Sequence, residues 1–374
     1  MKNLVYIFFI FLVICACSQD KKTYGTDHYV YLLDPGDIKM MDDKGADFFS
    51  EINMIPLKED PNFLIGNAYK LIKCDSFFYV LDNDKTHSIY KYDHEGNPVK
   101  RFFNRGGSGN EYIEIIDFDI DQSSKEILVF CVPPKILYTD TDFNNLGKNN
   151  NLAYNYFDRI VSWKNNIFLY NHNERQVVHL NTETGEIEEC FRTRKLNDLI
   201  NPACFAFFKT SDNLYFQSPG DDCIYKLQGN KFIPFLTLDY KTKESSIKFY
   251  EERDLSDRIT LEDSRLHSIP EVHNIREKGN KFIFTYVHNI VFRICIYDTV
   301  QRTYKDQIEY MYISEHNGGC YDNTLYGLEN PLDMNTFKMP EYHEYMKGVK
   351  YDFTGKLDFD EEFENPVVIE QILK

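Results

Sequence analysis

The stretch Phe77–Ile115, FFYVLDNDKTHSIYKYDHEGNPVKRFFNRGGSGNEYIEI, decides the fold of this 374-residue chain. It holds three short strand patterns, at residues 77–81, 88–92 and 99–103, which contain aromatic and β-branched side chains. The polar run DHEGN at residues 93–97 is typical of a tight turn between the second and third patterns. Three strands joined by short connections predict an antiparallel meander, a unit that cannot bury its apolar face alone.

Short strands of the same kind recur along the chain after polar turns. Six of them begin at residues 78, 127, 167, 214, 282 and 325, so the intervals are 49, 40, 47, 68 and 43 residues. Intervals of about 40–50 residues are typical of four-stranded propeller blades. Because each sheet has a face to bury, the sheets must pack face to face around an axis. The sequence therefore predicts an all-β fold, a six-bladed β-propeller with four-stranded antiparallel blades, over residues 48–374.

Two segments depart from the plain repeat. The long interval contains a charged run at residues 241–265 whose apolar residues have a helical spacing, which predicts a helical insertion on one face of the ring. Near the N-terminus, the alternating segment Ile52–Leu57 reads as a strand, and the chain ends in another strand pattern after Pro366. We expect the N-terminal strand to complete the last blade, because closing the ring removes two exposed sheet edges.

The composition supports the all-β interpretation and limits the partners. Tyrosine and phenylalanine are abundant, with 27 and 30 residues against one tryptophan, which suits many short strands. The formal net charge is −17, so a nucleic acid or an anionic lipid surface would be repelled at long range. We therefore expect no nucleic-acid partner.

The first 17 residues have the features of a bacterial export signal. A basic start precedes an apolar run, Leu4–Ala16, which is too short to span a membrane but has the length of a secretory signal. Residues 14–17, ICAC, resemble the bacterial lipobox, in which a small residue precedes a cysteine that receives lipid. We therefore predict a lipoprotein signal peptide at residues 1–16, lipidation of Cys17 and a tether over residues 17–47. The lipid would anchor the mature protein in the cell envelope. The outer membrane is the expected site, with the protein facing either the periplasm or the medium. A plain secretory signal is the alternative.

The remaining cysteines and the histidines do not point to a metal. Seven cysteines lie beyond Cys17, and no two of them form a C-x-x-C pair. An odd number cannot all pair in disulfides, so buried free thiols in strands are expected. The ten histidines are scattered without a zinc-ligand spacing. We predict no metal site and no cofactor.

With these features, the chain resembles a family of six-bladed β-propeller lipoproteins of Bacteroidetes, related in architecture to NHL-repeat propellers. The resemblance runs from about Ile52 to the end of the chain. Its most specific piece is Phe102–Tyr112, FFNRGGSGNEY, which is similar to a G-x-G-P-G-E-Y element of that family, although Ser108 stands where proline is usual. Much of the family has no assigned activity, so the resemblance implies a fold more strongly than a function.

The glycine-rich element supplies the candidate ligand-binding residues Arg105, Glu111 and Tyr112. It lacks the lysine and spacing of a phosphate-binding loop and leads into a strand pattern, so we expect a flexible connection whose glycines adopt positive φ. The next strand carries aspartates at positions 117, 119 and 121, without the glycine and glutamate of an EF-hand loop. Their alternation predicts a solvated strand edge.

No catalytic residues are assigned, because the chain has no G-x-S-x-G and no other recognisable catalytic motif. A rigid ring with variable loops needs no such motif to bind. The favoured function is an envelope-anchored binding or scaffolding module for a glycan, peptide or protein partner. The alternatives are a hydrolase or lyase with its site at the central channel, and an accessory component of an outer-membrane transport assembly.

Overall fold

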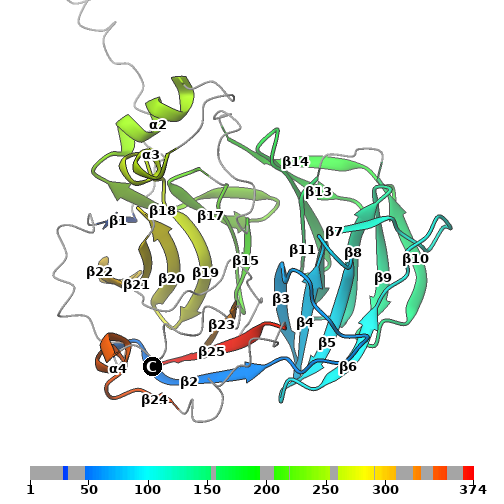
Figure 1. Ribbon diagram of the computed structural model, residues 1–374. Coiled ribbons are helices and arrows are strands. Elements are labelled where there is room, and N and C mark those ends of the chain that lie inside the picture. Colours follow the sequence, from blue (N-terminus) through cyan, green and yellow to red (C-terminus); the bar gives the residue numbers. More distant parts are fainter. Residues whose placement is uncertain are drawn as a thin grey trace, which may run out of the picture.

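The computed structural model describes residues 28–32, 47–152, 157–193, 206–218, 220–252, 260–289, 291–308, 323–329, 340–351 and 365–374. These residues form six β-sheets arranged in a ring, which confirms the six-bladed β-propeller (Figure 1). The predicted signal peptide, Cys17 and most of the predicted tether lie outside the described residues.

Blades 1 to 5 are each built from four consecutive antiparallel strands, with the first strand innermost. Blade 1 contains β3 (Lys70–Cys74), β4 (Phe77–Asp82), β5 (Ser88–Asp93) and β6 (Pro98–Phe102), and blade 2 contains β7 (Glu114–Asp121), β8 (Glu126–Val132), β9 (Lys135–Asp140) and β10 (Asn145–Asn151). Blade 3 contains β11 (Arg159–Trp163), β12 (Asn166–Asn171), β13 (Gln176–Leu180) and β14 (Ile187–Arg192), and blade 4 contains β15 (Phe207–Lys209), β16 (Leu214–Phe216), β17 (Cys223–Gln228) and β18 (Lys231–Tyr240). Blade 5 contains β19 (Glu271–Lys278), β20 (Lys281–His288), β21 (Val291–Asp298) and β22 (Thr303–Ile308).

Blade 6 is assembled from both ends of the chain. Its strand order is β23 (Thr324–Glu329), β25 (Val367–Leu373), β2 (Phe49–Pro56) and β24 (Lys350–Tyr351). The N-terminal strand β2 pairs antiparallel with the C-terminal strand β25 along almost its whole length. The predicted closure of the ring by the N-terminal strand is therefore confirmed, and Figure 1 shows the two strands side by side (blue and red).

The strand repeat seen in the sequence marks the second strand of most blades. Five of the six recurring strands correspond to β4, β8, β12, β16 and β20, which lie second from the axis. The sixth corresponds to β23, which is the innermost strand of blade 6. Of the other five innermost strands, which line the axis, only β7 was predicted as a strand from the sequence.

Neighbouring blades are held together by apolar side chains from their facing sheets. One core cluster joins blade 1 to blade 6, with Phe78 and Tyr90 packed near Tyr326 and Val368. The rings of Phe78 and Tyr326 meet edge to face with centroids 6.0 Å apart. The abundant aromatic residues thus serve mainly as core between blades, which holds the innermost strands in fixed positions around the axis.

Further elements decorate the ring. Strand β1 (Tyr29–Leu32) pairs parallel with β18 and makes blade 4 five-stranded. Helices α2 (Lys243–Glu252) and α3 (Leu261–Leu266) lie between blades 4 and 5, in the region where the sequence suggests a helical insertion, and α4 (Pro340–Tyr345) precedes β24. Among the described residues, none of the helices has the length and apolar character needed to cross a membrane.

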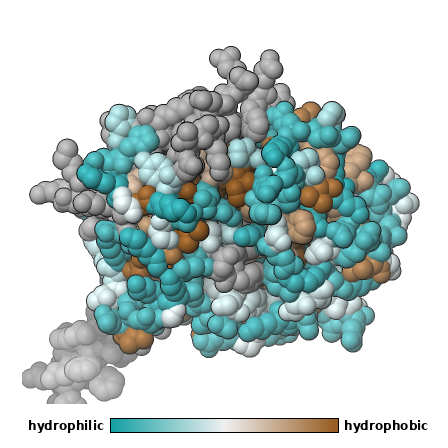
Figure 2. Space-filling model, turned by 90° about the horizontal axis from the view of Figure 1, so that it is seen from below, coloured by the Kyte–Doolittle hydropathy of each residue, from teal (hydrophilic) through white to brown (hydrophobic). Residues whose placement is uncertain are grey.

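One side of the ring is mainly hydrophilic (Figure 2), and the described thiols lie in its interior. Figure 2 shows one side of the ring, where hydrophilic residues dominate and hydrophobic residues form small groups. Five of the seven cysteines beyond Cys17 lie in the described part, and all five are buried and free, as the sequence suggests.

Candidate functional site

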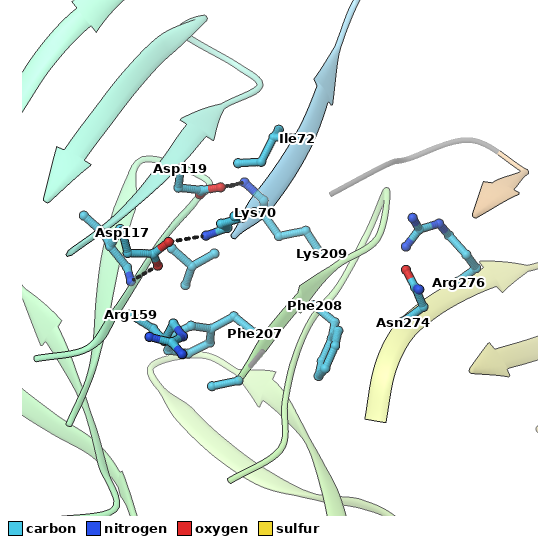
Figure 3. Close-up of a pocket in the computed structure, with 13 residues that line it drawn as sticks. Lys70, Ile72, Asp117, Asp119, Arg159, Phe207, Phe208, Lys209, Asn274 and Arg276 are labelled. Atoms are coloured by element: carbon cyan, nitrogen blue, oxygen red, sulfur yellow. Dashed lines mark hydrogen bonds and ion pairs between the residues drawn. The ribbon is translucent and has the colours of Figure 1, made fainter. Parts of the chain in front are cut away.

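The site is a cavity on the propeller axis, which we call the central cavity (Figure 3). It is lined by side chains of β3, β7, β11, β15 and β19, the innermost strands of blades 1 to 5. Residues two apart on a strand face the same side, so each strand presents a pair to the axis. The polar and charged lining residues are Lys70, Asp117, Asp119, Arg159, Lys209, Asn274 and Arg276.

A first buried ion pair links blade 1 to blade 2. The ammonium group of Lys70 lies 2.8 Å from Oδ1 of Asp117 and also donates to the carbonyl oxygen of Phe118 at 2.7 Å. The other carboxylate oxygen of Asp117 accepts a hydrogen bond of 2.9 Å from the backbone N–H of Ile160 in blade 3. One carboxylate therefore connects three blades at the axis.

A second pair repeats this arrangement across the ring. Both carboxylate oxygens of Asp119 lie 2.7 Å from the ammonium group of Lys209 in blade 4. Oδ2 of Asp119 also accepts a hydrogen bond of 2.6 Å from the backbone N–H of Ser162, and the Ser162 hydroxyl donates to Asp121. Such charges are stable inside a protein only when they are paired and hydrogen-bonded, as both are here.

The expectation that the three alternating aspartates form a solvated strand edge is wrong. Asp117, Asp119 and Asp121 are 0%, 2% and 6% exposed and lie on the innermost strand of blade 2. Their carboxylates accept backbone and hydroxyl hydrogen bonds from β11 and thereby attach blade 2 to blade 3. Among the described residues, no group of three or more acidic, histidine or cysteine side chains is arranged to hold a metal ion.

The blade 5 side of the cavity is different. Asn274 is 1% exposed, and neither atom of its amide has a hydrogen-bond partner within the described part of the chain. Arg276 lies two residues further along the same strand. Its guanidinium donates to the carbonyl oxygens of Thr324 at 3.0 Å and Ile275 at 2.6 Å. Figure 3 shows both side chains on β19, facing the cavity. A buried amide with no partner is costly, by about 1–3 kcal/mol, and calls for an explanation.

The charge of the cavity is opposite to that of the protein. The described lining has four cationic side chains, on Lys70, Arg159, Lys209 and Arg276, and two carboxylates. Cationic side chains therefore outnumber carboxylates by two in the described lining, within a chain whose formal net charge is −17. Clefts lined by one sign of charge concentrate ligands of the opposite sign.

The cavity is also small. Its free volume is about 40 Å³, which is room for about three water molecules. Pockets that enclose a whole small molecule usually measure about 300–1,000 Å³. The central cavity can thus hold one functional group of a ligand rather than an entire sugar or nucleotide.

The candidate ligand-binding residues from the sequence lie elsewhere, in the connection between β6 and β7. Arg105 donates from Nε to the carbonyl oxygen of Ile113 at 2.9 Å, and Glu111 accepts a bond of 2.7 Å from the backbone N–H of Ser108. That backbone hydrogen bond holds the pKa of Glu111 below its usual value. These contacts stabilise the connection itself. A role of Arg105 and Glu111 in ligand binding stays a prediction.

Tyr112, the third candidate, is completely buried. Its hydroxyl donates to the carbonyl oxygen of His87 at 2.8 Å and accepts from the backbone N–H of Asn104 at 3.2 Å, and its ring stacks on Phe102. Burial raises its pKa to about 12. None of the three candidates lines the central cavity, and binding by Tyr112 likewise stays a prediction.

The expectation that the glycines of this connection adopt positive φ is wrong. Gly106, Gly107 and Gly109 are absent from the described glycines with left-handed backbone. At Gly106 a Cβ would lie 2.2 Å from Oε2 of Glu111, so a side chain there would displace the Glu111 carboxylate. The glycine lets the carboxylate fold back over the loop.

A second buried polar cluster lies in blade 4, beside helix α2. Tyr225 donates from its hydroxyl to Asp221 at 2.9 Å, and Lys243 of α2 forms an ion pair with Asp222. Burial, and then the neighbouring Asp222, raise the pKa of Asp221 to about 7. This cluster attaches α2 to the ring and does not reach the central cavity.

Comparison with known proteins identifies a family and a fold. Residues 37–367 match the family model described as "Domain of unknown function (DUF4934)", and no curated protein matches the sequence. Among solved structures, a Bacteroides fragilis chain named "putative exported protein" is 14% identical with a TM-score of 0.70, and 92% of this chain and 99% of that chain are covered. The RRP9 WD40 repeats are 12% identical with a TM-score of 0.47, over 87% of this chain and 98% of that chain.

At 14% identity, the likeness to the Bacteroides fragilis structure shows the fold alone. The family match is stronger, because it extends over most of the chain, from the segment before β2 to the first residue of β25. The chain therefore belongs to the DUF4934 family, defined by a domain of unknown function.

Proposed function

We propose that this protein is an exported, lipid-anchored binding module of the bacterial cell envelope, whose propeller recognises its partner at the central cavity. The observation that carries the proposal is Asn274, whose buried amide faces the cavity and has no partner among the described residues. Nearly all buried polar groups in proteins are hydrogen-bonded. A bound group that accepts from and donates to this amide would account for the exception.

Binding is a better explanation of the site than catalysis. The described lining contains no serine, cysteine or histidine that would serve as a nucleophile or a base. Its two carboxylates are both engaged by lysines, through Lys70 and Lys209. Fixed charges around a small cavity favour recognition of a group over a reaction.

Export and anchoring rest on the N-terminal sequence. The apolar run before Cys17 and the lipobox-like ICAC support a lipoprotein signal. The name of the similar Bacteroides fragilis structure is consistent with export. Substituting Cys17→Ala should move the protein from the detergent phase to the aqueous phase when cells are extracted; a variant that still partitions into detergent would refute the anchor.

The binding function is tested by thermal shift on the mature chain, residues 17–374 with Cys17→Ser so that no lipid is attached. Glycans, short peptides and metal ions are screened, and each compound that stabilises the chain is tested again on Asn274→Leu. Asn166→Leu is the matched control, because Asn166 is an exposed amide at the start of β12 and does not line the central cavity. We expect ligands whose effect is lost in Asn274→Leu and kept in Asn166→Leu. No stabilising compound, or effects that survive in Asn274→Leu, would contradict the proposal.

A further inference from the structure

The backbone beside the site is irregular in a way that aims two side chains at the axis. The pairing of β19 with β20 shifts between Val272 and Asn274, so one extra residue bulges from the strand just before Asn274. The pairing of β7 with β8 shifts in the same way just before Asp117. Bulges of this kind re-aim side chains and are common next to binding sites. Both therefore direct a polar side chain into the central cavity.

Asn274 and Arg276 together form a donor pair on one strand. They lie two residues apart on β19, and Figure 3 shows them next to each other on the side of the cavity opposite Asp117 and Asp119. The Asn274 amide supplies N–H donors, and a guanidinium is the group best shaped to bind a planar carboxylate. The acidic residues of the cavity are already bound to lysines, whereas the Asn274 amide is not bound to any described residue.

The size and the charge of the cavity also suit a carboxylate. A free volume of about 40 Å³ corresponds to about three water molecules, which is close to the space taken by the two oxygens and one carbon of a carboxylate. The described lining has four cationic side chains against two carboxylates, a composition that suits an anion better than a neutral amide of the same shape. The small volume excludes a sugar ring from the cavity itself.

Building on the proposed function, we propose that the central cavity captures a single carboxylate, which Asn274 and Arg276 hold from the blade 5 side. The carboxylate is either that of a small free acid or the side chain of a glutamate or aspartate in a bound peptide. In both cases the bound oxygens accept hydrogen bonds from Nδ2 of the buried Asn274 amide and place negative charge beside the cationic side chains of the lining.

The experiment measures the melting temperature of the mature chain in low-chloride buffer. Sodium acetate is compared with acetamide, and the blocked peptide acetyl-Gly-Glu-Gly-amide with its glutamine counterpart; sodium chloride reports the general effect of salt. At ten times its dissociation constant, the carboxylate partner should raise the melting temperature by about 2 °C, and the rise should saturate. Acetate alone identifies a free acid, and the glutamate peptide alone identifies a peptide side chain.

A variant gives a test that does not depend on the ligand. Asn274→Asp places a carboxylate within the positive cavity, so it should raise the melting temperature of the unliganded chain by about 2–5 °C and abolish the response to acetate or peptide. Asn365→Asp is the matched control, since Asn365 is equally buried but donates to the carbonyl oxygen of Phe63 at 2.7 Å. The control should lower the melting temperature.

Three results would overturn the proposal. The first is no saturable effect of either carboxylate. The second is an Asn274→Asp variant that loses stability as Asn365→Asp does. The third is that the glutamate and glutamine peptides bind equally well and that Asn274→Leu binds neither. This result would support a binding module with its site at the central cavity and would refute only the proposal that the ligand is a carboxylate.

Discussion

Substituting Gly96→Ala should destabilise the closed ring, measured as the free energy of unfolding, far more than Gly185→Ala, which changes a glycine of another turn. Gly96 lies in the turn between β5 and β6, and its backbone has a φ of +77°, a conformation that favours glycine. A Cβ at this position would lie 2.1 Å from the carbonyl oxygen of Pro56, at the end of the closing strand β2. The Gly96 carbonyl also accepts a hydrogen bond of 2.9 Å from the backbone N–H of Lys58. The methyl group would therefore push the turn away from the strand that closes blade 6.

The size of the effect follows from three contributions. The left-handed backbone costs alanine about 1–2 kcal/mol. Displacing packed backbone costs about 1–3 kcal/mol, and the hydrogen bond to Lys58 contributes about 1 kcal/mol. We expect Gly96→Ala to lower the free energy of unfolding by about 3–6 kcal/mol. Gly185→Ala is the control, because Gly185 has a φ of +74° but no atom within 4 Å of its Cβ position; it should cost only about 1–2 kcal/mol.

Both variants are compared with the parent chain by urea unfolding, followed by circular dichroism. The free energies come from the midpoints and slopes of the transitions, and an unchanged slope shows that the same surface is exposed on unfolding. Equal losses for Gly96→Ala and Gly185→Ala would show that the turn does not press against β2. That result would refute this account of how the N-terminal strand is held in the ring.

Three further predictions concern the buried polar groups. Lys209→Met leaves the Asp119 carboxylate unpaired in the central cavity and should cost about 3–5 kcal/mol in urea unfolding; adding Asp119→Asn should restore part of the loss, and additive losses would argue against the pair. Asp221 beside Asp222 has a pKa of about 7 in the folded chain, above its unfolded value of about 3.9. The stability that protonated Asp221 provides is therefore complete below about pH 4 and is lost as the pH rises to about 7. A pH series of melting temperatures should therefore fall less steeply for Asp221→Asn, and an unchanged slope would contradict the raised pKa. Tyr112→Phe removes two buried hydrogen bonds and should cost about 1–3 kcal/mol while leaving the acetate response intact; a lost response would instead make Tyr112 a ligand residue.

The architecture could be predicted because its signals are local. In the stretch Phe77–Ile115, polar turns separate three aromatic strand patterns, which became β4, β5 and β6 almost residue for residue. The closing strand was also predictable. An open row of blades would leave an exposed sheet edge at each end, and both ends of the chain carry strand patterns that can pair there. Aromatic residues in alternating strands pointed correctly to a core between blades.

The central cavity was not predictable, because its residues look like solvent-exposed positions. The segment Glu114–Asp121, EIIDFDID, carries alternating carboxylates, which in a single sequence indicate a hydrated edge. They are buried because cationic partners arrive from other blades: Lys70 and Lys209 are 47 and 90 residues from the aspartates they bind. Pairing at such separation depends on the closed ring and leaves no local pattern.

The glycine-rich connection shows the converse, a conspicuous sequence with no contact to the central cavity. Its composition drew attention to Arg105, Glu111 and Tyr112, whereas the contacts found for these side chains tie the loop together. The residue that marks the cavity, Asn274, sits in the unremarkable segment Glu271–Lys278, EVHNIREK. A buried amide without a partner is visible only once the surrounding blades are in place.

The most direct test of the central claim is a crystal structure of the mature chain grown with sodium bromide, because the anomalous scattering of bromide locates a bound anion. We predict a bromide ion at the axis, within hydrogen-bonding distance of Nδ2 of Asn274 and the guanidinium of Arg276, and its loss in Asn274→Asp crystals. Bromide ions bound only to surface lysines, with water alone beside Asn274, would contradict the claim that the propeller holds an anionic group at its axis.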